Sequence, residues 1–264
     1  MSAVLGRYPL ASFYALAYAF TWSLGLPLML SRRGLIAADV PHWVEPIAAF
    51  GPFVAAMLVA RALSGRDGPR DILASLGHWR VGPLWALVAL LSPVGLLLLA
   101  LLVAGVLGES PSFASPAAGE LTTLAGLVDL VVVGGVLQAW GEEPGWRGLA
   151  LPRLRQRFGP LLATLALWPV WLCWHLPFFL SRPEFGWAQW VAFSVGILSA
   201  AVWLTLIRDG TRSVLMCVGW HAVVNICRGL ALAVSTTAFL AISNFVLLGA
   251  LLIAVGWTWQ RRRA

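Results

Sequence analysis

The chain has 264 residues, of which 60% are hydrophobic and only 11% are charged. In a soluble domain about a quarter of all residues are charged, so this composition excludes an ordinary soluble fold. It predicts a polytopic membrane protein. The net charge of +7 comes from arginine alone. Because the arginines lie between apolar segments rather than on one soluble face, we expect no nucleic-acid partner.

Eight apolar segments approach or exceed the roughly 20 residues that a helix needs to cross a bilayer. The predicted spans are 8–30, 43–63, 81–107, 121–141, 161–180, 187–207, 213–233 and 236–259. The first is too long for the core of a typical signal peptide, so we expect it to be retained. The boundary between the last two spans is the least defined. The pattern predicts an all-α membrane bundle of about eight helices that forms one domain over residues 1–264.

The distribution of arginine predicts the orientation of this bundle. With eight spans, both termini and the even-numbered loops share one side, and that side holds 14 of the 18 arginines. Cytoplasmic segments carry the excess of basic residues, so both termini are predicted to be cytoplasmic. The absence of lysine and the bias toward arginine, alanine and leucine suggest a bacterial plasma membrane.

The end of the fourth span carries Glu142-Glu143-Pro-Gly-Trp-Arg147. Ionisable groups at membrane depth are costly and persist mainly where they pair or do chemistry. Glu143 and Arg147 lie four residues apart on one helix face, so an ordinary ion pair at the interface is one explanation. Glu142 and Glu143 point about 100° apart and need not act alike. Pro144 and Gly145 predict a kink or break, which membranes tolerate beside a water-filled cavity.

Two later spans add further polar groups. His175 lies in the fifth span, one turn after Trp171, and His221 and Asn225 share a face of the seventh. Taken singly, a histidine is more often a satisfied core residue, and a His–Asn pair often joins neighbouring helices. A shared cluster satisfies all of these groups, whereas separate placement leaves each without a partner. The three spans are therefore predicted to form one buried polar cavity in a core at residues 121–233.

The order of these motifs resembles that of a known family. E-E-x-x-x-R, an aromatic-x-x-x-H and H-x-x-x-N on successive membrane helices resemble the type II CAAX prenyl endopeptidases. These belong to the wider Abi family of CAAX proteases and bacteriocin-processing enzymes. The resemblance covers about residues 130–230 and departs at Trp171, where the family usually has phenylalanine. It implies an intramembrane endopeptidase whose site opens toward the cytoplasm and whose substrate is a membrane-associated peptide or protein.

The resemblance also implies which residues act. They are those of the three motifs, Glu142, Glu143, Arg147, His175, His221 and Asn225. By this analogy Glu142 and His175 activate a water. His221 and Asn225 form the oxyanion hole, while Glu143 and Arg147 shape and charge the pocket.

Dependence on a metal is the open alternative for this site. The family has long been classed with metalloproteases, and Glu142, His175 and His221 would meet the minimum ligand number of catalytic zinc. A glutamate-activated water needs no metal, and the amide of Asn225 is a poor zinc ligand. We therefore expect no cofactor, with a divalent metal such as zinc as the alternative.

Two other functions remain open. A transporter or proton relay also places carboxylates and histidines in the membrane, but it more often shows related broken helices in two halves of the chain. The sequence shows no such repeat. The second is a non-catalytic immunity or scaffold protein of the same fold. The intact set of Glu142, His175, His221 and Asn225 argues against it, because an idle site has no reason to keep costly groups. The motifs name neither the substrate, its prenylation, nor an oligomeric state.

Overall fold

The structure is a computed structural model that describes residues 2–261 except 42, 110–111, 113–115 and 184–185. The described residues form helices and contain no strand. Seven helices among them are long and apolar enough to cross a membrane. These are Pro9–Arg32, Val44–Ser64, Pro83–Val106, Leu124–Arg155, Trp187–Thr211, Val214–Val234 and Thr236–Gln260. The predicted all-α membrane bundle is confirmed.

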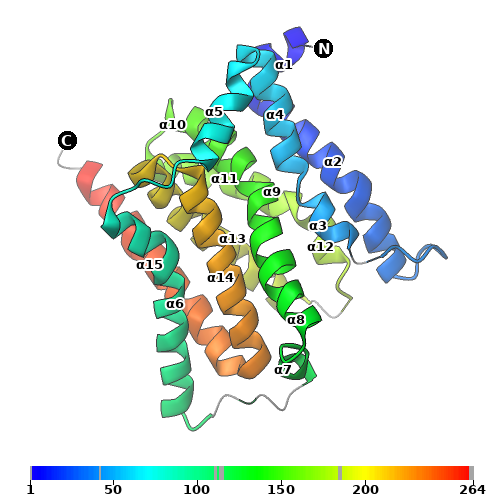
Figure 1. Cartoon of the computed structure of the whole chain (residues 1–264), viewed down its shortest axis with the longest axis vertical. Coiled ribbons are helices and arrows are strands. Elements are labelled where there is room, and N and C mark those ends of the chain that lie inside the picture. The colour runs from blue at the N-terminus through cyan, green and yellow to red at the C-terminus, as the bar shows by residue number, and fades with distance from the viewer. Residues whose placement is uncertain (1, 42, 110–111, 113–115, 184–185, 262–264) are drawn as a thin grey trace.

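The first part of the chain forms the two edges of the bundle (Figure 1). Its helices are α1 (Ser2–Arg7), α2 (Pro9–Arg32), α3 (Val44–Ala48), α4 (Gly51–Ser64), α5 (Asp67–Leu76) and α6 (Pro83–Val106). Helices α2 and α4 pack together at one edge, and α6 packs at the other edge against the last two helices of the chain. The helices that carry the three motifs lie between these edges.

The first motif lies in one long helical segment that follows α7 (Pro116–Glu120). The segment consists of α8 (Leu124–Val128), η1 (Asp129–Leu137), α9 (Gln138–Gly145), η2 (Trp146–Ala150) and α10 (Leu151–Arg155). The sequence predicted a kink or break at Pro144 and Gly145. The helix is not broken there, because it continues through both residues into η2. Proline has no N–H to donate one turn back, and the next turns widen to the π-helical pattern of η2.

The second motif lies where the predicted span 161–180 divides in two. These helices are α11 (Pro160–Trp174) and α12 (Leu176–Leu180), and they meet at His175. The His175 N–H bonds to the carbonyls of Leu172 and Cys173, which tightens the last turn of α11. Pro177 lacks an N–H and restricts the residue before it, so the helix cannot continue unchanged. The expected single span is therefore corrected to two shorter helices.

The last three helices are α13 (Trp187–Thr211), α14 (Val214–Val234) and α15 (Thr236–Arg261). Only Ser235 separates α14 from α15, in agreement with the predicted boundary between the last two spans. The start of the chain and the end of α15 lie toward the same end of the bundle as α5 and α10 (Figure 1). Both ends of the described chain therefore lie toward one end of the bundle.

Two glycines set the position of α9. A Cβ atom on Gly141 would lie 2.6 Å from the Ala49 carbonyl oxygen, and one on Gly145 would lie 2.6 Å from the Pro52 Cβ. The absence of side chains thus lets α9 lie directly against the start of α4. Glu143, two residues after Gly141, points about 200° around the helix from this contact and faces the interior.

Candidate active site

A buried ion-pair cluster joins α9 to α14. The Oε1 atom of Glu143 accepts hydrogen bonds from Arg147 Nη1 at 3.0 Å and from His221 Nδ1 at 2.7 Å. The side chains of Glu143 and Arg147 are fully buried, so this is not an ordinary ion pair at the membrane interface. An ionised carboxylate only accepts, so His221 carries a hydrogen on Nδ1, and its Nε2 is left for another partner.

The Arg147 guanidinium also stacks on α11 through its contact with Trp171. Its central carbon lies 4.1 Å from the centroid of the Trp171 ring. Within the described part of the chain, Arg147 Nε and Nη2 have no hydrogen-bond acceptor. Two interactions therefore hold the buried Arg147 side chain among the described residues. They are its charged hydrogen bond to Glu143 and the attraction between the guanidinium and the face of the Trp171 ring.

Glu142 belongs to a second group, shared with α11. Its Oε2 accepts a hydrogen bond of 2.6 Å from Trp171 Nε1, and the same oxygen lies 4.0 Å from His175 Nε2. His175 Nδ1 lies 2.8 Å from the Trp171 carbonyl oxygen. Because a carbonyl only accepts, the hydrogen lies on Nδ1, and a neutral His175 presents a bare Nε2 toward Glu142.

Trp171 connects the two groups. Its ring contacts both histidines, with centroid separations of 5.8 Å to His175 and 5.9 Å to His221. The structure thus brings five of the six predicted residues around one buried tryptophan.

Asn225 is the residue that the structure does not join to this cluster. It lies one turn after His221 on α14, and its Nδ2 donates to the Gly134 carbonyl in η1 at 3.2 Å. This bond uses one of the two N–H groups of the amide. The second remains for another acceptor.

Three contacts of the cluster were not predicted from the sequence. Trp171 was recognised as the aromatic of the second motif but not as a donor to Glu142. Phe193 of α13 packs against His175 with ring centroids 5.2 Å apart. Arg208 of α13 donates from Nε to the Arg147 carbonyl at 2.9 Å. Because both α13 residues lie on another helix, no spacing within a motif could have indicated them.

The donor set considered for zinc consists of Glu142, His175 and His221. Among the described residues, no group of three or more His, Cys, Asp or Glu side chains is placed to hold a metal ion. His221 Nδ1 is bonded to Glu143 and Glu142 Oε2 is bonded to Trp171. Each of these bonds occupies one atom of its side chain, and the Nε2 atoms of His175 and His221 stay available.

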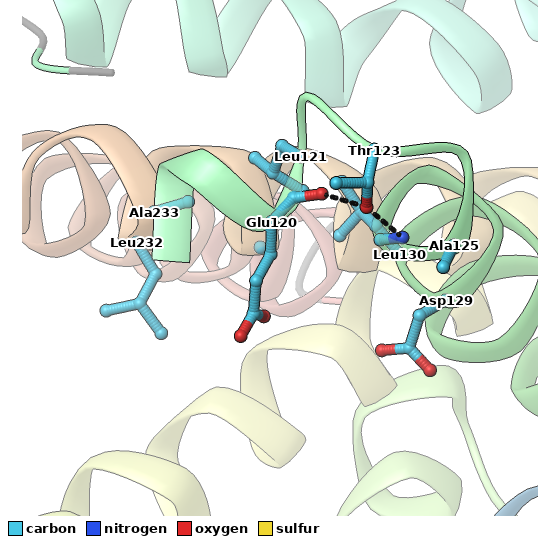
Figure 2. Close-up of a pocket in the computed structure, with 10 residues that line it drawn as sticks. Glu120, Leu121, Thr123, Ala125, Asp129, Leu130, Leu232 and Ala233 are labelled. Carbon is cyan, nitrogen blue, oxygen red and sulfur yellow. Dashed lines mark hydrogen bonds between the residues drawn. The ribbon is translucent and has the colours of Figure 1, made fainter. Parts of the chain in front are cut away.

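A pocket of about 510 Å³ lies apart from this cluster, at the beginning of the long helical segment (Figure 2). It is bordered by the carboxylates of Glu120 and Asp129 and contains none of the six predicted residues. The Thr123 hydroxyl there donates to the Glu120 carbonyl and accepts from the Gly126 N–H. These bonds close the turn between α7 and α8.

Comparison with known proteins agrees with the motifs. Residues 124–227 match the family described as Type II CAAX prenyl endopeptidase Rce1-like. This segment contains all three motifs, and the predicted family resemblance is confirmed. Among curated proteins, no sequence matches the chain.

Proposed function

We propose that Glu142 and His175 activate a water for peptide hydrolysis, because residues 124–227 match the family described as Type II CAAX prenyl endopeptidase Rce1-like. The family supports an intramembrane protease in general. The assignment of the two residues depends on their geometry in the buried cluster.

The separation between Glu142 and His175 carries this proposal. An ionised Glu142 Oε2 and the Nε2 of a neutral His175 are both hydrogen-bond acceptors, and they lie 4.0 Å apart. Two hydrogen bonds of about 2.8 Å at one water oxygen span about 4.0–4.6 Å, so a single water can donate to both atoms. A water held in this way presents its oxygen lone pairs to a substrate carbonyl.

The reaction then proceeds by general base and general acid catalysis. Glu142 takes a proton from the water as the water oxygen bonds to the carbonyl carbon, and the carbonyl oxygen becomes an oxyanion. When the tetrahedral intermediate collapses, the C–N bond breaks, and the protonated Glu142 returns its proton to the leaving nitrogen. His175 accepts the second hydrogen bond of the water and orients it.

His221 and Asn225 are the proposed oxyanion donors. Donation from His221 Nε2 requires a proton on both ring nitrogens, and the Glu143 carboxylate, 2.7 Å from Nδ1, balances the resulting charge. Asn225 has one N–H left after its bond to Gly134. Arg147 in turn holds Glu143 in position.

We assign a membrane-associated peptide or protein as the substrate and the cytoplasmic side as the side from which it enters. The excess of arginine at the end of the bundle that holds both termini supports this orientation.

The test is cleavage of a membrane-delivered peptide library by the purified full-length chain. Glu142→Gln is expected to lower the cleavage rate by at least about a thousandfold, because the amide cannot accept the proton. Asp129→Asn is the matched control, since it makes the same change in the same helical segment, at an exposed carboxylate far from the cluster. Equal activity of wild type and Glu142→Gln would overturn the assignment.

A second arm of the same experiment addresses the metal. We propose that no metal takes part, so a strong chelator is expected to leave wild-type cleavage unchanged. Loss of cleavage on chelation, with recovery on adding zinc, would overturn this part of the proposal and leave the peptidase assignment intact. If wild type is folded but cleaves nothing, transport or scaffolding gains support.

A further inference from the structure

A second pocket lies between α10 and the end of α13, away from the catalytic cluster. Its volume is about 480 Å³. It is lined by Leu151, Pro152, Arg155, Gln156, Arg208, Asp209 and Arg212. Three arginines and one aspartate give this lining an excess of positive charge.

The hydrogen bonds show which of these charges are already occupied. Arg155 binds the Asp209 carboxylate at 2.9 Å and donates to the Phe158 carbonyl at 2.7 Å. Arg208 donates from Nε to the Arg147 carbonyl. In the portion of the chain that the structure describes, the terminal nitrogens of Arg208 and the whole guanidinium of Arg212 have no hydrogen-bond acceptor. Two cations with free N–H groups therefore border the pocket.

The position of the pocket indicates its ligand. Arg155 ends one apolar span and Arg208 lies in the last turn of another, so the pocket lies where the helices leave the membrane. The anion present at that depth is the phosphate of a phospholipid headgroup. Phe158 lies in the turn before α11 and Leu162 in its first turn, and both are exposed and offer an apolar surface to an acyl chain. We propose that this pocket binds the phosphate group of an anionic phospholipid, with Arg208 and Arg212 as the donors.

A lipid in this pocket would also affect the catalytic cluster. Arg208 holds the main-chain carbonyl of Arg147, whose side chain binds Glu143. Fixing the Arg208 guanidinium from the pocket side therefore stabilises the turn that carries Arg147. Lipid binding itself does not depend on whether the cluster cleaves peptides.

The test measures lipid binding to the purified full-length chain in neutral detergent. The probes are phosphatidylglycerol, phosphatidylcholine with the same acyl chains, and inorganic phosphate. Native mass spectrometry reports the retained lipid, and the unfolding midpoint reports stabilisation. Phosphatidylglycerol is expected to be retained and to raise the midpoint, whereas phosphatidylcholine and inorganic phosphate are not.

The variants locate the site. Arg212→Gln is expected to weaken phosphatidylglycerol binding by about fivefold, and the Arg208→Gln/Arg212→Gln pair by about 25-fold, because each interfacial arginine contributes about one such factor. Arg66→Gln is the matched control, since it removes an exposed arginine from the loop between α4 and α5. Arg212→Gln loses no side-chain hydrogen bond in the free protein, so it decides the question even if the double variant fails to fold.

Two results would overturn the proposal. Equal weakening by Arg66→Gln and Arg212→Gln would mean that binding reflects the overall surface charge. Displacement of phosphatidylglycerol by inorganic phosphate at millimolar concentration would mean that the pocket is a small-anion site and not a lipid site.

Discussion

Glu143 accepts hydrogen bonds from Arg147 on its own helical segment and from His221 on α14, and all three side chains are buried. Placing charges in such an environment is costly unless each is compensated. The cluster therefore depends on Glu143 more than on either partner, because Glu143 is the residue that both others share.

Glu143→Gln is expected to lower the free energy of unfolding by about 3–5 kcal/mol, since it leaves the buried Arg147 cation without a counter-charge. The free energy of unfolding is measured in mixed detergent micelles at increasing concentrations of dodecyl sulfate. Asp67→Asn is the control, because its ion pair with Arg70 is exposed and such pairs contribute about 0–1 kcal/mol. Similar losses in both variants would contradict this prediction, because they would show that the buried pair contributes no more to stability than the exposed pair.

The side chain of Trp171 has two separable roles, one for its N–H group and one for its ring. Its N–H binds Glu142, while its ring contacts Arg147 and both histidines. Phenylalanine, the usual residue of the family at this position, keeps most of the ring and loses only the donor.

Trp171→Phe is expected to retain cleavage and to lower stability by about 1.5–3 kcal/mol, the contribution of a hydrogen bond to a charged group. Trp171→Ala is expected to abolish cleavage, because the ring between the two histidines is lost as well. Trp168→Phe provides the control on the same helix, since it removes a hydrogen bond to the neutral Ser194 carbonyl. Loss of all cleavage in Trp171→Phe would show that the donor to Glu142 is indispensable here.

At the scale of the elements, the contact between α9 and α4 orients both glutamates. Gly141 and Gly145 lie four residues apart and share a helix face, which is the spacing that lets membrane helices approach closely. The rotation of α9 about its axis is therefore determined by two residues that have no side chain.

Gly145→Ala is expected to destabilise the fold by about 1–3 kcal/mol, because the added Cβ overlaps Pro52, and to reduce cleavage by displacing the glutamates. Gly148→Ala is the control in the same segment, where the nearest atoms to a Cβ lie at an ordinary 3.5 Å. The same unfolding and cleavage assays compare the two variants. A Gly145→Ala protein as stable and active as Gly148→Ala would contradict the proposed role of this contact.

At the scale of the whole molecule, the bundle places both termini, the α4–α5 turn and α10 toward one end (Figure 1). The arginines concentrated there predict that this end is cytoplasmic.

Single cysteines can test this orientation in a cysteine-free background, since Cys173, Cys217 and Cys227 form no disulfide. A membrane-impermeant maleimide is expected to label Asp39→Cys in intact cells and Arg66→Cys only after permeabilisation. Both residues are exposed, so accessibility alone does not separate them. The reverse labelling pattern would invert the predicted topology.

The sequence by itself determined the class of fold, most of the spans and the three motifs. Apolar length and helical spacing are local properties, so Glu143 with Arg147, or His221 with Asn225, could be placed on shared faces without a structure. Of the kink or break predicted at Pro144, the break does not occur, because the helix continues and widens to the π-helical pattern. At His175 the sequence-based prediction missed the division of a span, because local proline effects have more than one structural outcome.

Only the tertiary structure decided which of these faces meet. Glu143 bonds to His221 across 78 positions of sequence, and Trp171 lies between Glu142 and the two histidines. Such contacts depend on how closely α9 approaches α4 and how far each helix is rotated. No periodicity within a single helix encodes these quantities, because they result from packing between helices.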